Sequence, residues 1–491
     1  MIRTLLVTTV TFLLCFSLGW GALVTPMGAK APCRITCASG TFPPGFARNH
    51  STGSIEGKPT ESGILRLTLH LADTRGAGRT TSGKVNVKVG RILTVGEHGT
   101  FNGFEGIQMA LNAAQDGDEI RVERGVYGGT GLLVPENKVW QHGIRISGGW
   151  DETFREATKD AGTTVLQGKG GENRILTISE SIHRGKVILE NLTFRDGSGG
   201  AVKTVSVTPT VFINCSFDYN SVTGSKLDLS TRALAYMQLG SGGAVEGSAS
   251  FTDCMFWKNS AEHYGGAVDG DGTYANCTFV GNSAGFGGAV SGSGTFTRCV
   301  FKNNSASGAK QVEAGTGLGL GEKYVGMGGA AKGDGFFVSC AFARNSADHG
   351  GAASGSATFI NCTFCDNKAE DKGGGIEGGG SVINSVFYKN VAAAEDNDIA
   401  ATSNIDIDFC LLNYLAGAAD YGHNNIMGDP KFVNAESGDL HLLADSPCIN
   451  VGSLSPELKK RLGKLLLDLD GKPRVVGGKI DMGAYEWQGQ R

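Results

Sequence analysis

One short pattern, Phe-x-x-Asn followed by a Gly-Gly pair, recurs along this chain at nearly constant spacing. Clear copies are FWKNSAEHYGGAV from Phe256, FVGNSAGFGGAV from Phe279 and FCDNKAEDKGGGI from Phe364. The intervals between aligned asparagines are 22 or 23 residues, apart from two of 39 and 41. A fixed period of this length predicts a solenoid, in which each repeat is one coil stacked on the last. The aligned residues are Asn220, Asn259, Asn282, Asn304, Asn345, Asn367 and Asn390.

Apolar residues also recur at fixed places in each repeat. Two residues before each phenylalanine stands a cysteine, and three residues before that a large apolar residue. The segment FINCTF alternates, so that Ile360, Cys362 and Phe364 share one face, and this period of two predicts short strands. The glycine pairs argue against helical repeats and suit tight corners. The cysteines are Cys215, Cys254, Cys277, Cys299, Cys340 and Cys362, with Ser385 at the same place in the next copy.

These features together predict an all-β fold, a right-handed parallel β-helix solenoid of about a dozen coils. Adjacent coils would lie about 4.8 Å apart, so equivalent side chains stack into ladders, phenylalanine on phenylalanine and cysteine on cysteine. The asparagines would pass amide hydrogen bonds from coil to coil. GIRISGGW from Gly143 and VILENLTF from Val187 are expected to be earlier coils, and IDIDFCLLN from Ile405 a later one.

The chain divides into four predicted segments. Residues 1–31 have the form of a secretory signal peptide, with Arg3 before an apolar run and a small-x-small site at Ala29-Lys30-Ala31. An uncleaved membrane anchor is the alternative. Residues 32–94 form an irregular N-terminal segment with two short strands, ILRLTLHL and KVNVKV. The parallel β-helix spans 95–452, and 453–491 form a C-terminal cap.

Helices are expected only near the two ends of the β-helix. GFEGIQMALNAAQDGD, from Gly103, has apolar residues at Ile107, Ala110, Leu111 and Ala114, the spacing of an amphipathic helix. This segment is predicted to be an N-terminal capping helix, because an open sheet edge invites aggregation. PELKKRLGKLLL in the tail is a second helix candidate.

Composition excludes several classes of protein. The 491 residues include 77 glycines but only 11 prolines, without the G-X-Y period of collagen. The net charge is -4 with both signs mixed, so nucleic acid is not an expected partner. Nothing after the signal segment is apolar enough to span a bilayer. We therefore expect a secreted protein that is not transmembrane apart from the signal segment.

The pairing of Phe-x-x-Asn with Gly-Gly-Ala-Val resembles the repeat of the chlamydial polymorphic outer membrane proteins. More widely, the chain is similar to secreted bacterial parallel β-helix proteins with the pectin-lyase-like fold. ISGGWDETF from Ile146 and LDLDGKPRVVGGKIDMGAYEW from Leu467 contribute to this likeness. The resemblance implies the fold and a bacterial location that is extracellular or on the outer-membrane surface. It implies no single activity, since the fold carries lyases, hydrolases, epimerases and adhesins.

The chain has twelve cysteines, which in a secreted protein suggest disulfides. Stacked equivalents would have Cβ atoms about 4.8 Å apart, longer than the roughly 3.8 Å of a disulfide. We therefore predict that the cysteine column consists of buried free thiols. Cys33 and Cys37 lie off the column, and their pairing is left open. A single ladder offers no tetrahedral zinc geometry, so no zinc site is expected.

The position after Gly-Gly-Ala-Val carries the candidate chemistry. Glu246 and Asp269 would lie one coil apart, near the roughly 5 Å carboxylate separation of a retaining glycosidase. With Lys332, they are the candidate catalytic residues. The alternative is that these are turn residues present for backbone reasons. We expect Glu246→Gln to change stability very little. The full set is Glu246, Asp269, Ser291, Lys332, Ser354 and Glu377.

Two further groups of side chains, a pair of histidines and the acidic residues of the tail, are candidate metal ligands. His263 and His349 are assigned to one common repeat position, three coils apart, so they cannot share an ion and are interpreted as solvated turn residues. The tail offers a possible calcium site, but polar contacts within the cap are the preferred interpretation, and no other cofactor is expected. Its acidic residues are Asp468, Asp470, Asp481 and Glu486.

Two insertions, 222–240 and 307–327, account for the long intervals and interrupt the regular wall. Loops on a rigid scaffold often carry function. We expect a non-enzymatic surface protein, an adhesin or a glycan-binding or structural module, whose partner is a polysaccharide or a cell-surface component. The alternative is a polysaccharide lyase or glycoside hydrolase that acts in a groove near Glu246, Asp269 and Lys332.

Overall fold

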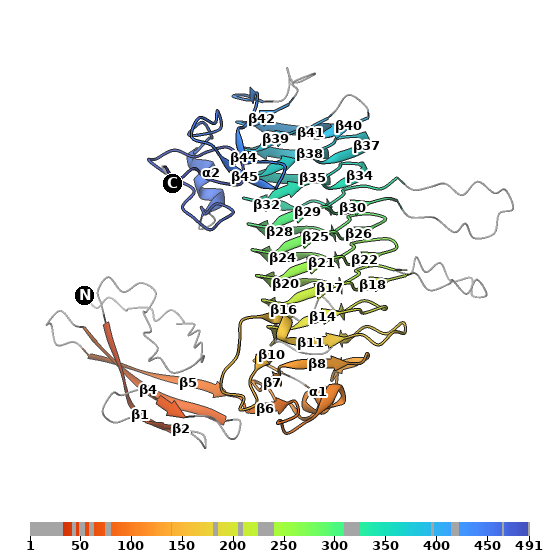
Figure 1. Cartoon of the computed structure of the whole chain (residues 1–491). Helices are drawn as coiled ribbons and strands as arrows, with labels where there is room; N and C mark the ends of the chain where they lie inside the picture. Colours follow the sequence, from red (N-terminus) through yellow and green to blue (C-terminus); the bar gives the residue numbers. More distant parts are fainter. Residues whose placement is uncertain are drawn as a thin grey trace. The chain divides into compact units, whose positions relative to one another are not determined.

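The structure is a computed structural model, and its chain forms two compact units (Figure 1). One unit comprises residues 1–93 with 115–119, and the other 94–114 with 120–491. The predicted signal peptide and most of both insertions lie outside the described residues. The described ranges are 33–41, 46–48, 55–57, 63–73, 80–138, 140–179, 185–204, 210–223, 240–308, 325–393, 397–413, 422–463 and 466–489.

The first unit contains an antiparallel sheet with the order β1-β4-β5. Its strands are β1 (Cys33–Thr41), β4 (Gly63–Asp73) and β5 (Thr80–Val89), and a separate hairpin pairs β2 (Phe46–Arg48) with β3 (Ile55–Gly57). Both predicted strands of this segment are confirmed, as β4 and β5. Each alternates apolar and polar residues, the period of an extended strand.

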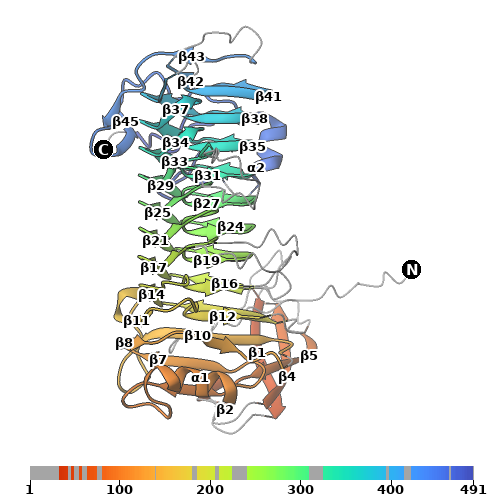
Figure 2. The same cartoon turned by 90° about the vertical axis from the view of Figure 1, so that its right-hand side faces the viewer.

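The second unit is a parallel β-helix built from three sheets, whose coils are stacked as Figures 1 and 2 show. The 12-stranded sheet contributes one strand to each level, in agreement with the predicted dozen coils. It consists of β8 (Gly125–Gly128), β11 (Thr164–Gln167), β14 (Thr193–Arg195), β17 (Ser216–Asp218), β21 (Met255–Trp257), β25 (Thr278–Val280), β29 (Val300–Lys302), β33 (Ala341–Ala343), β36 (Thr363–Cys365), β39 (Val386–Tyr388), β42 (Leu411–Leu412) and β43 (Ile426–Met427).

The two other sheets form the remaining walls of the coils. The 7-stranded sheet consists of β18 (Ser221–Val222), β22 (Ser260–Ala261), β26 (Ser283–Ala284), β30 (Ser305–Ala306), β34 (Ser346–His349), β37 (Lys368–Lys372) and β40 (Val391–Ala392). The 19-stranded sheet consists of β6 (Ile92–Val95), β7 (Glu119–Glu123), β9 (Leu132–Val134), β10 (Gly143–Trp150), β12 (Leu176–Ile178), β13 (Lys186–Glu190), β15 (Val202–Lys203), β16 (Thr210–Ile213), β19 (Val245–Glu246), β20 (Ala249–Thr252), β23 (Val268–Asp269), β24 (Gly272–Ala275), β27 (Val290–Ser291), β28 (Gly294–Thr297), β31 (Ala331–Lys332), β32 (Phe336–Val338), β35 (Ala353–Ile360), β38 (Ile376–Ile383) and β41 (Ile399–Asp408).

Stacked aromatic rings fill the interior, as predicted. Phe279 lies in register between Phe256 and Phe301, and its ring centroid is 4.6 Å and 4.7 Å from theirs. A second column runs beside it, in which Tyr274 stacks on Phe296 at 4.4 Å. The two columns meet edge to face, an arrangement that aromatic pairs favour. All of these rings are buried, so the core is a continuous ladder.

The repeated asparagines form a second buried ladder, which confirms the predicted amide hydrogen bonds. Asn259 donates from its backbone N–H and from Nδ2 to Oδ1 of Asn282, both at 3.0 Å. Its Nδ2 also donates to the backbone oxygen of Phe217, at 2.8 Å. Asn282 repeats this pattern toward Asn304. Each asparagine side chain therefore forms hydrogen bonds with backbone N–H and C=O groups of the turns, which are not paired within a sheet.

The glycine pairs stand at tight corners. Gly287 has φ 61°, in the left-handed region that favours glycine. A Cβ on Gly288 would approach the backbone oxygen of Gly329 to 2.1 Å. The first glycine thus permits the turn, and the second permits the close approach of the next coil.

The cysteine column is buried and free of disulfides, as predicted. Burial raises the pKa of Cys277 and Cys299 well above its ordinary value. Ser385 takes the same place, because its Oγ accepts from the backbone N–H of Cys362 at 3.1 Å. The side chains of Cys33 and Cys37 lie outside the described part of the structure. Free cysteines among the described residues are Cys215, Cys254, Cys277, Cys299, Cys340, Cys362, Cys365, Cys410 and Cys448.

Helix α1 (Gly103–Ala113) forms where its apolar spacing predicts, with Ile107, Ala110 and Leu111 buried. The helix lies against β8 and β9, near the first coils in Figure 2. Gln108 accepts from the backbone N–H of Leu133 at 2.7 Å and donates to its oxygen at 2.9 Å. That this helix caps the β-helix stays a prediction. Among the described residues, no helix has the length and apolarity needed to cross a membrane.

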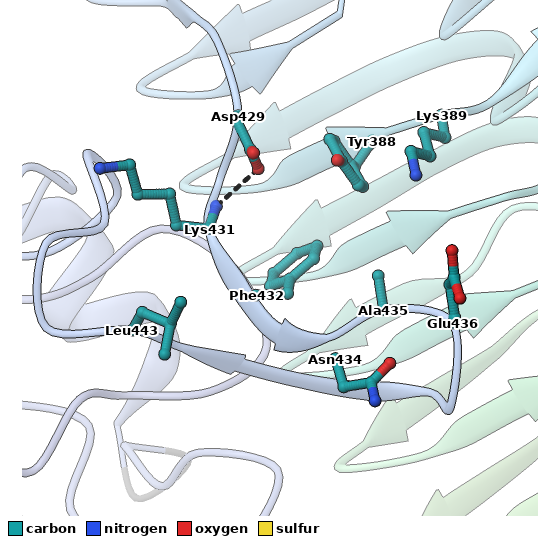
Figure 3. A pocket seen from close by; sticks show the side chains of 9 residues that line it. All are labelled: Tyr388, Lys389, Asp429, Lys431, Phe432, Asn434, Ala435, Glu436 and Leu443. Atoms are coloured by element: carbon teal, nitrogen blue, oxygen red, sulfur yellow. Dashed lines mark hydrogen bonds between the residues drawn. The ribbon is translucent and has the colours of Figure 1, made fainter.

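The C-terminal segment packs along the side of the last coils. It contains the hairpin β44 (Phe432–Asn434) and β45 (Asp439–Leu442) and the helix α2 (Pro456–Leu462), which matches the first part of the predicted tail helix. Phe432 meets the Tyr388 ring edge-on at 5.7 Å, and a small pocket lies beside them (Figure 3). Leu458 and Leu462 pack on Val338 and Ile360. The predicted C-terminal cap therefore lies against the side of the last coils.

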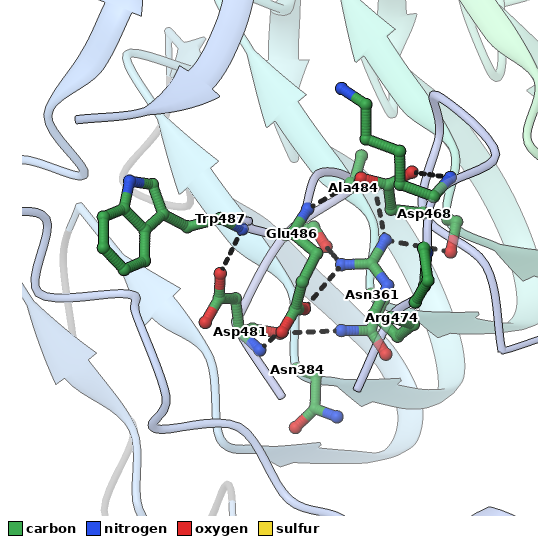
Figure 4. Close-up of polar contacts among 12 residues, drawn as sticks. Asn361, Asn384, Asp468, Arg474, Asp481, Ala484, Glu486 and Trp487 are labelled. Carbon is green, nitrogen blue, oxygen red and sulfur yellow. Dashed lines mark hydrogen bonds and ion pairs between the residues drawn. The ribbon is translucent and has the colours of Figure 1, made fainter. Parts of the chain in front are cut away.

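Buried polar contacts fix this segment to the coils (Figure 4). Arg474 donates to Oγ of Ser339 at 3.0 Å and lies 3.6 Å from Glu486. Asp481 accepts from the backbone N–H groups of Asn450 and Trp487, both at 2.6 Å. No group of three metal-binding side chains occurs among the described residues. Asp481 and Glu486 thus make polar contacts within this segment, as expected for tail carboxylates.

We expect Phe279→Ala to lower the free energy of unfolding by about 3–5 kcal/mol, because the missing ring leaves a cavity between two stacked neighbours. Urea denaturation followed by circular dichroism measures this loss. Val280, the next residue and only partly buried, provides the control, since Val280→Ala should cost less than about 1 kcal/mol. Equal losses for the two variants would contradict the aromatic ladder.

Candidate functional site

The candidate residues form one column along the 19-stranded sheet, here called the polar column. Glu246 is the register partner of Asp269, and Asp269 of Ser291. Lys332 follows Ser291 directly. The predicted adjacency of Glu246 and Asp269 is therefore confirmed, whereas Lys332 lies two levels beyond Asp269. The column consists of Glu246, Asp269, Ser291, Lys332, Ser354 and Glu377.

Two cations hold the carboxylate of Glu246. Nη2 of Arg174 lies 2.6 Å from Oε2, and Nζ of Lys203 lies 2.8 Å from Oε1. Arg174 is buried and also donates to the backbone oxygen of Ser241 at 2.9 Å. The sequence interpretation missed Arg174, because it stands 72 residues before Glu246 and outside the recognised repeats.

Asp269 is placed where its protonation can change near neutral pH. Burial raises the pKa of its carboxyl to about 6, and the negative charge of Glu246 acts in the same direction. The nearby Ser241 and Ser291 hydroxyls and the positive charge of Arg174 oppose this rise. A carboxyl group with such a pKa can serve as a proton donor or acceptor, or bind a ligand differently in its two states.

An aromatic column lies beside the polar column. Tyr264, Phe286, Met327 and His349 follow one another in register, one in each coil. The rings of Tyr264 and Phe286 stack with centroids 5.3 Å apart and planes tilted by 23°, and Tyr264 is 39% exposed. We call this pair the aromatic platform. The variable residue before Gly-Gly concealed it in the sequence, since the four coils carry four different residues there.

Lys332 connects the two columns. Its Nζ lies 5.9 Å from the ring centroid of Tyr264 and 5.7 Å from that of Phe286, within reach of cation–π attraction. No carboxylate lies within 4.0 Å of this ammonium in the part of the chain that the structure describes. The platform therefore has a positive charge above it that no acidic side chain of the described residues neutralises.

The predicted equivalence of His263 and His349 is wrong. His349 aligns with Met327, Phe286 and Tyr264, because the coil that contains His263 has one more residue between its asparagine and Gly-Gly. His349 is also not simply solvated. Its Nδ1 lies 3.2 Å from Glu377 and its Nε2 3.2 Å from Asp371, with 19% of the side chain exposed.

Both insertions re-enter the β-helix next to the aromatic platform. The first returns at Gly240, and the N–H of Gly242 donates to the oxygen of Tyr264 at 2.8 Å. The second returns before Met327, the register neighbour of Phe286. Residues 224–239 and 309–324 lie outside the described residues. The platform thus stands on two coils between the return points of the two insertions.

Residues 361–379 match the family model described as the Chlamydia polymorphic membrane protein (PMP) repeat. The coils of this β-helix are PMP-like repeats. The matched segment runs from Asn361 in the turn before β36 to the start of β38, nearly one coil. The other PMP-like coils repeat its columns in register. No curated protein matches the chain.

Several solved structures superpose on much of the chain at low identity. Pectate lyase Pel9A is 12% identical, with 77% of this chain and 90% of that chain covered and a TM-score of 0.38. A rhamnogalacturonan lyase is 11% identical, with 76% and 99% covered and a TM-score of 0.38. The pectin methylesterase from Aspergillus niger is 13% identical, with 64% and 89% covered and a TM-score of 0.29. Likenesses of this extent carry no activity over to the PMP-like chain.

The contacts of Glu246 reverse the sequence-based expectation for its substitution. Glu246→Gln would leave the Arg174 guanidinium buried without its carboxylate, so we expect a loss of about 2–4 kcal/mol in the free energy of unfolding. Denaturant titration measures this loss. Glu172→Gln, a change at an exposed carboxylate, is the control and should cost less than about 0.5 kcal/mol. A Glu246→Gln variant as stable as wild type would restore the original expectation.

Asp269→Asn should change stability in a pH-dependent way. The folded-state pKa of Asp269, about 6, lies above its ordinary value of 3.8, so the fold favours the protonated carboxyl. The wild type therefore loses stability relative to the amide variant as pH rises from 4 through 6. Above that range the variant should be more stable by roughly 2–3 kcal/mol. Unfolding curves at pH 4.5, 6 and 7.5 test this, and a difference that does not vary with pH would contradict it.

Proposed function

We propose that this protein is exported and acts at a cell surface or outside the cell as a non-enzymatic binding module. Its ligand is a glycan, bound on the face that joins the polar column, the aromatic platform and the two insertions. We call this the binding face. The observation that carries the proposal is the stacked Tyr264–Phe286 pair, which is partly exposed. Lys332 lies above it without a carboxylate partner among the described residues.

The chemistry of the binding face suits a sugar chain. Flat aromatic rings pack against the C–H face of a pyranose, and nearby polar groups exchange hydrogen bonds with its hydroxyls. Asp269 and Lys332, both partly exposed, provide such groups two coils apart, with the largely buried Ser291 on the coil between them. Because coils repeat about every 4.8 Å, the face offers similar groups at regular steps along an extended ligand.

Export and surface location rest on two sequence features. Residues 1–31 have the form of a secretory signal peptide. The repeat at 361–379 is of a type described for a membrane protein of Chlamydia. Both support a role outside the cytoplasm, as an adhesin or a glycan-binding or structural module.

A polysaccharide lyase or glycoside hydrolase is the second candidate. The pKa of Asp269, raised to about 6 beside Glu246, favours it, because a paired carboxyl group near neutrality can transfer protons. The ion pairs of Glu246 count against it. Arg174 and Lys203 each bind one carboxylate oxygen of Glu246, which leaves that group poorly placed to attack a ligand.

A glycan array probed with the purified full chain tests the proposal. We expect binding to one or more glycans, reduced about tenfold or more by Tyr264→Ala and by Lys332→Gln, since each removes a direct ligand contact. A matched pair on the 12-stranded sheet provides the control: Trp257 is 37% exposed, and Nζ of Lys258 lies 5.0 Å from its ring. Trp257→Ala and Lys258→Gln should leave binding unchanged.

The same array distinguishes binding from catalysis. Reaction mixtures are assayed for new reducing ends and for unsaturated products, and a binding module should release neither. Turnover that Asp269→Asn abolishes would overturn the proposal in favour of the enzyme. Glycan binding that survives both Tyr264→Ala and Lys332→Gln would show that the glycan does not bind at the binding face.

A further inference from the structure

A second candidate site lies away from the binding face, beside the C-terminal hairpin. It is a pocket of about 260 Å³ between the end of β39 and the segment that carries β44 and β45 (Figure 3). This volume is below the roughly 300–1,000 Å³ of sites for drug-sized ligands, so the pocket suits about one ring. Its lining is Tyr388, Lys389, Asp429, Lys431, Phe432, Asn434, Ala435, Glu436 and Leu443.

Two aromatic rings form the apolar part of the pocket. Phe432 meets Tyr388 with ring centroids 5.7 Å apart and planes at 86°. Phe432 also packs on the buried cluster that contains Leu411 and Leu442. Tyr388 is held by its coil and Phe432 by the hairpin, and part of each ring stays exposed to solvent.

The rim of the pocket carries donors and acceptors that the protein leaves available. Asp429 uses Oδ1 to accept from the backbone N–H of Lys431, at 2.8 Å. Glu436, at the other side of the pocket in Figure 3, has an exposed carboxylate outside every ion pair of the described residues. Lys389 lies over the Tyr388 ring at 5.2 Å and is likewise without a carboxylate partner in the described ranges.

Lys431 does not belong to this set. Its ammonium pairs with Asp445 at 2.5 Å and points away from the other labelled side chains in Figure 3. The available rim therefore combines two carboxylates, one ammonium and Nδ2 of the Asn434 amide, whose Oδ1 accepts from the backbone N–H of Ser437, around an aromatic floor. A simple anion would meet two negative charges here, and an apolar ligand would cover polar groups without bonding them.

We propose that this pocket binds one pyranose unit. The C–H face of the ring would pack on Tyr388, while its hydroxyls donate to Asp429 and Glu436 and accept from Lys389. A hydroxyl group both donates and accepts, so a polyol satisfies carboxylates and an ammonium together. The site is separate from the binding face and does not depend on the function proposed for it.

Saturation-transfer-difference NMR on the full chain tests the pocket. The probes are the methyl glycosides of glucose, galactose, mannose, N-acetylglucosamine and glucuronic acid. We expect transfer to the ring C–H protons of at least one probe, with affinity about tenfold lower in Glu436→Gln and in Lys389→Gln. Both side chains are exposed, so these variants should fold normally. Tyr388→Ala should abolish the signal.

Matched variants make the outcome decisive. Asp445→Asn removes an exposed carboxylate that pairs with Lys431 but does not itself line the pocket, and it should leave the affinity unchanged. Failure of every probe to bind would overturn the proposal that this pocket binds a pyranose. Affinity in Glu436→Gln and Lys389→Gln equal to that of wild type would also overturn it. Tyr264→Ala separates the two proposals. If this change removes the signal, the monosaccharide occupies the binding face and the pocket proposal fails, while array binding by wild type still supports the proposed function.

Discussion

Register between successive coils is the constraint on which this structure depends. Phe279, Asn282 and Gly288 each contact the same residue type in the coil before and the coil after. The buried asparagine amides make this register specific, because a shift by one residue would leave donors and acceptors without partners inside the wall. Aromatic stacking provides the buried apolar surface, and the amide ladder determines how each coil is aligned with the next.

The same periodicity explains how much the sequence could predict. The phenylalanine, asparagine and cysteine columns repeat at fixed intervals, so their neighbours in space follow from their spacing alone. Arg174 contacts Glu246 across 72 residues and outside the recognised repeats, where no such rule applies. One extra residue before Tyr264 was enough to misplace His349 by one position. The lateral position of the C-terminal segment depends on side-chain packing on Val338 and Ile360, which spacing does not reveal.

The proposed binding face arises where the repeat varies. The position before Gly-Gly is free to carry Tyr264, Phe286, Met327 or His349, because the backbone there needs only the bridge to the next coil. The position after Val268 similarly carries charged or hydroxyl residues. The invariant columns face inward and hold the scaffold, whereas these two columns lie at the surface beside the insertions. A rigid scaffold can in this way support different surface chemistry from coil to coil.

The column of buried thiols inside the β-helix differs in chemical reactivity between the folded and the unfolded chain. Thiolate is the reactive form of cysteine, and burial keeps Cys277 and Cys299 in the thiol form. Before the coils close, the same side chains are accessible to oxidants and to each other. Completion of the stack therefore protects these thiols from oxidation, which then requires local opening of the coils.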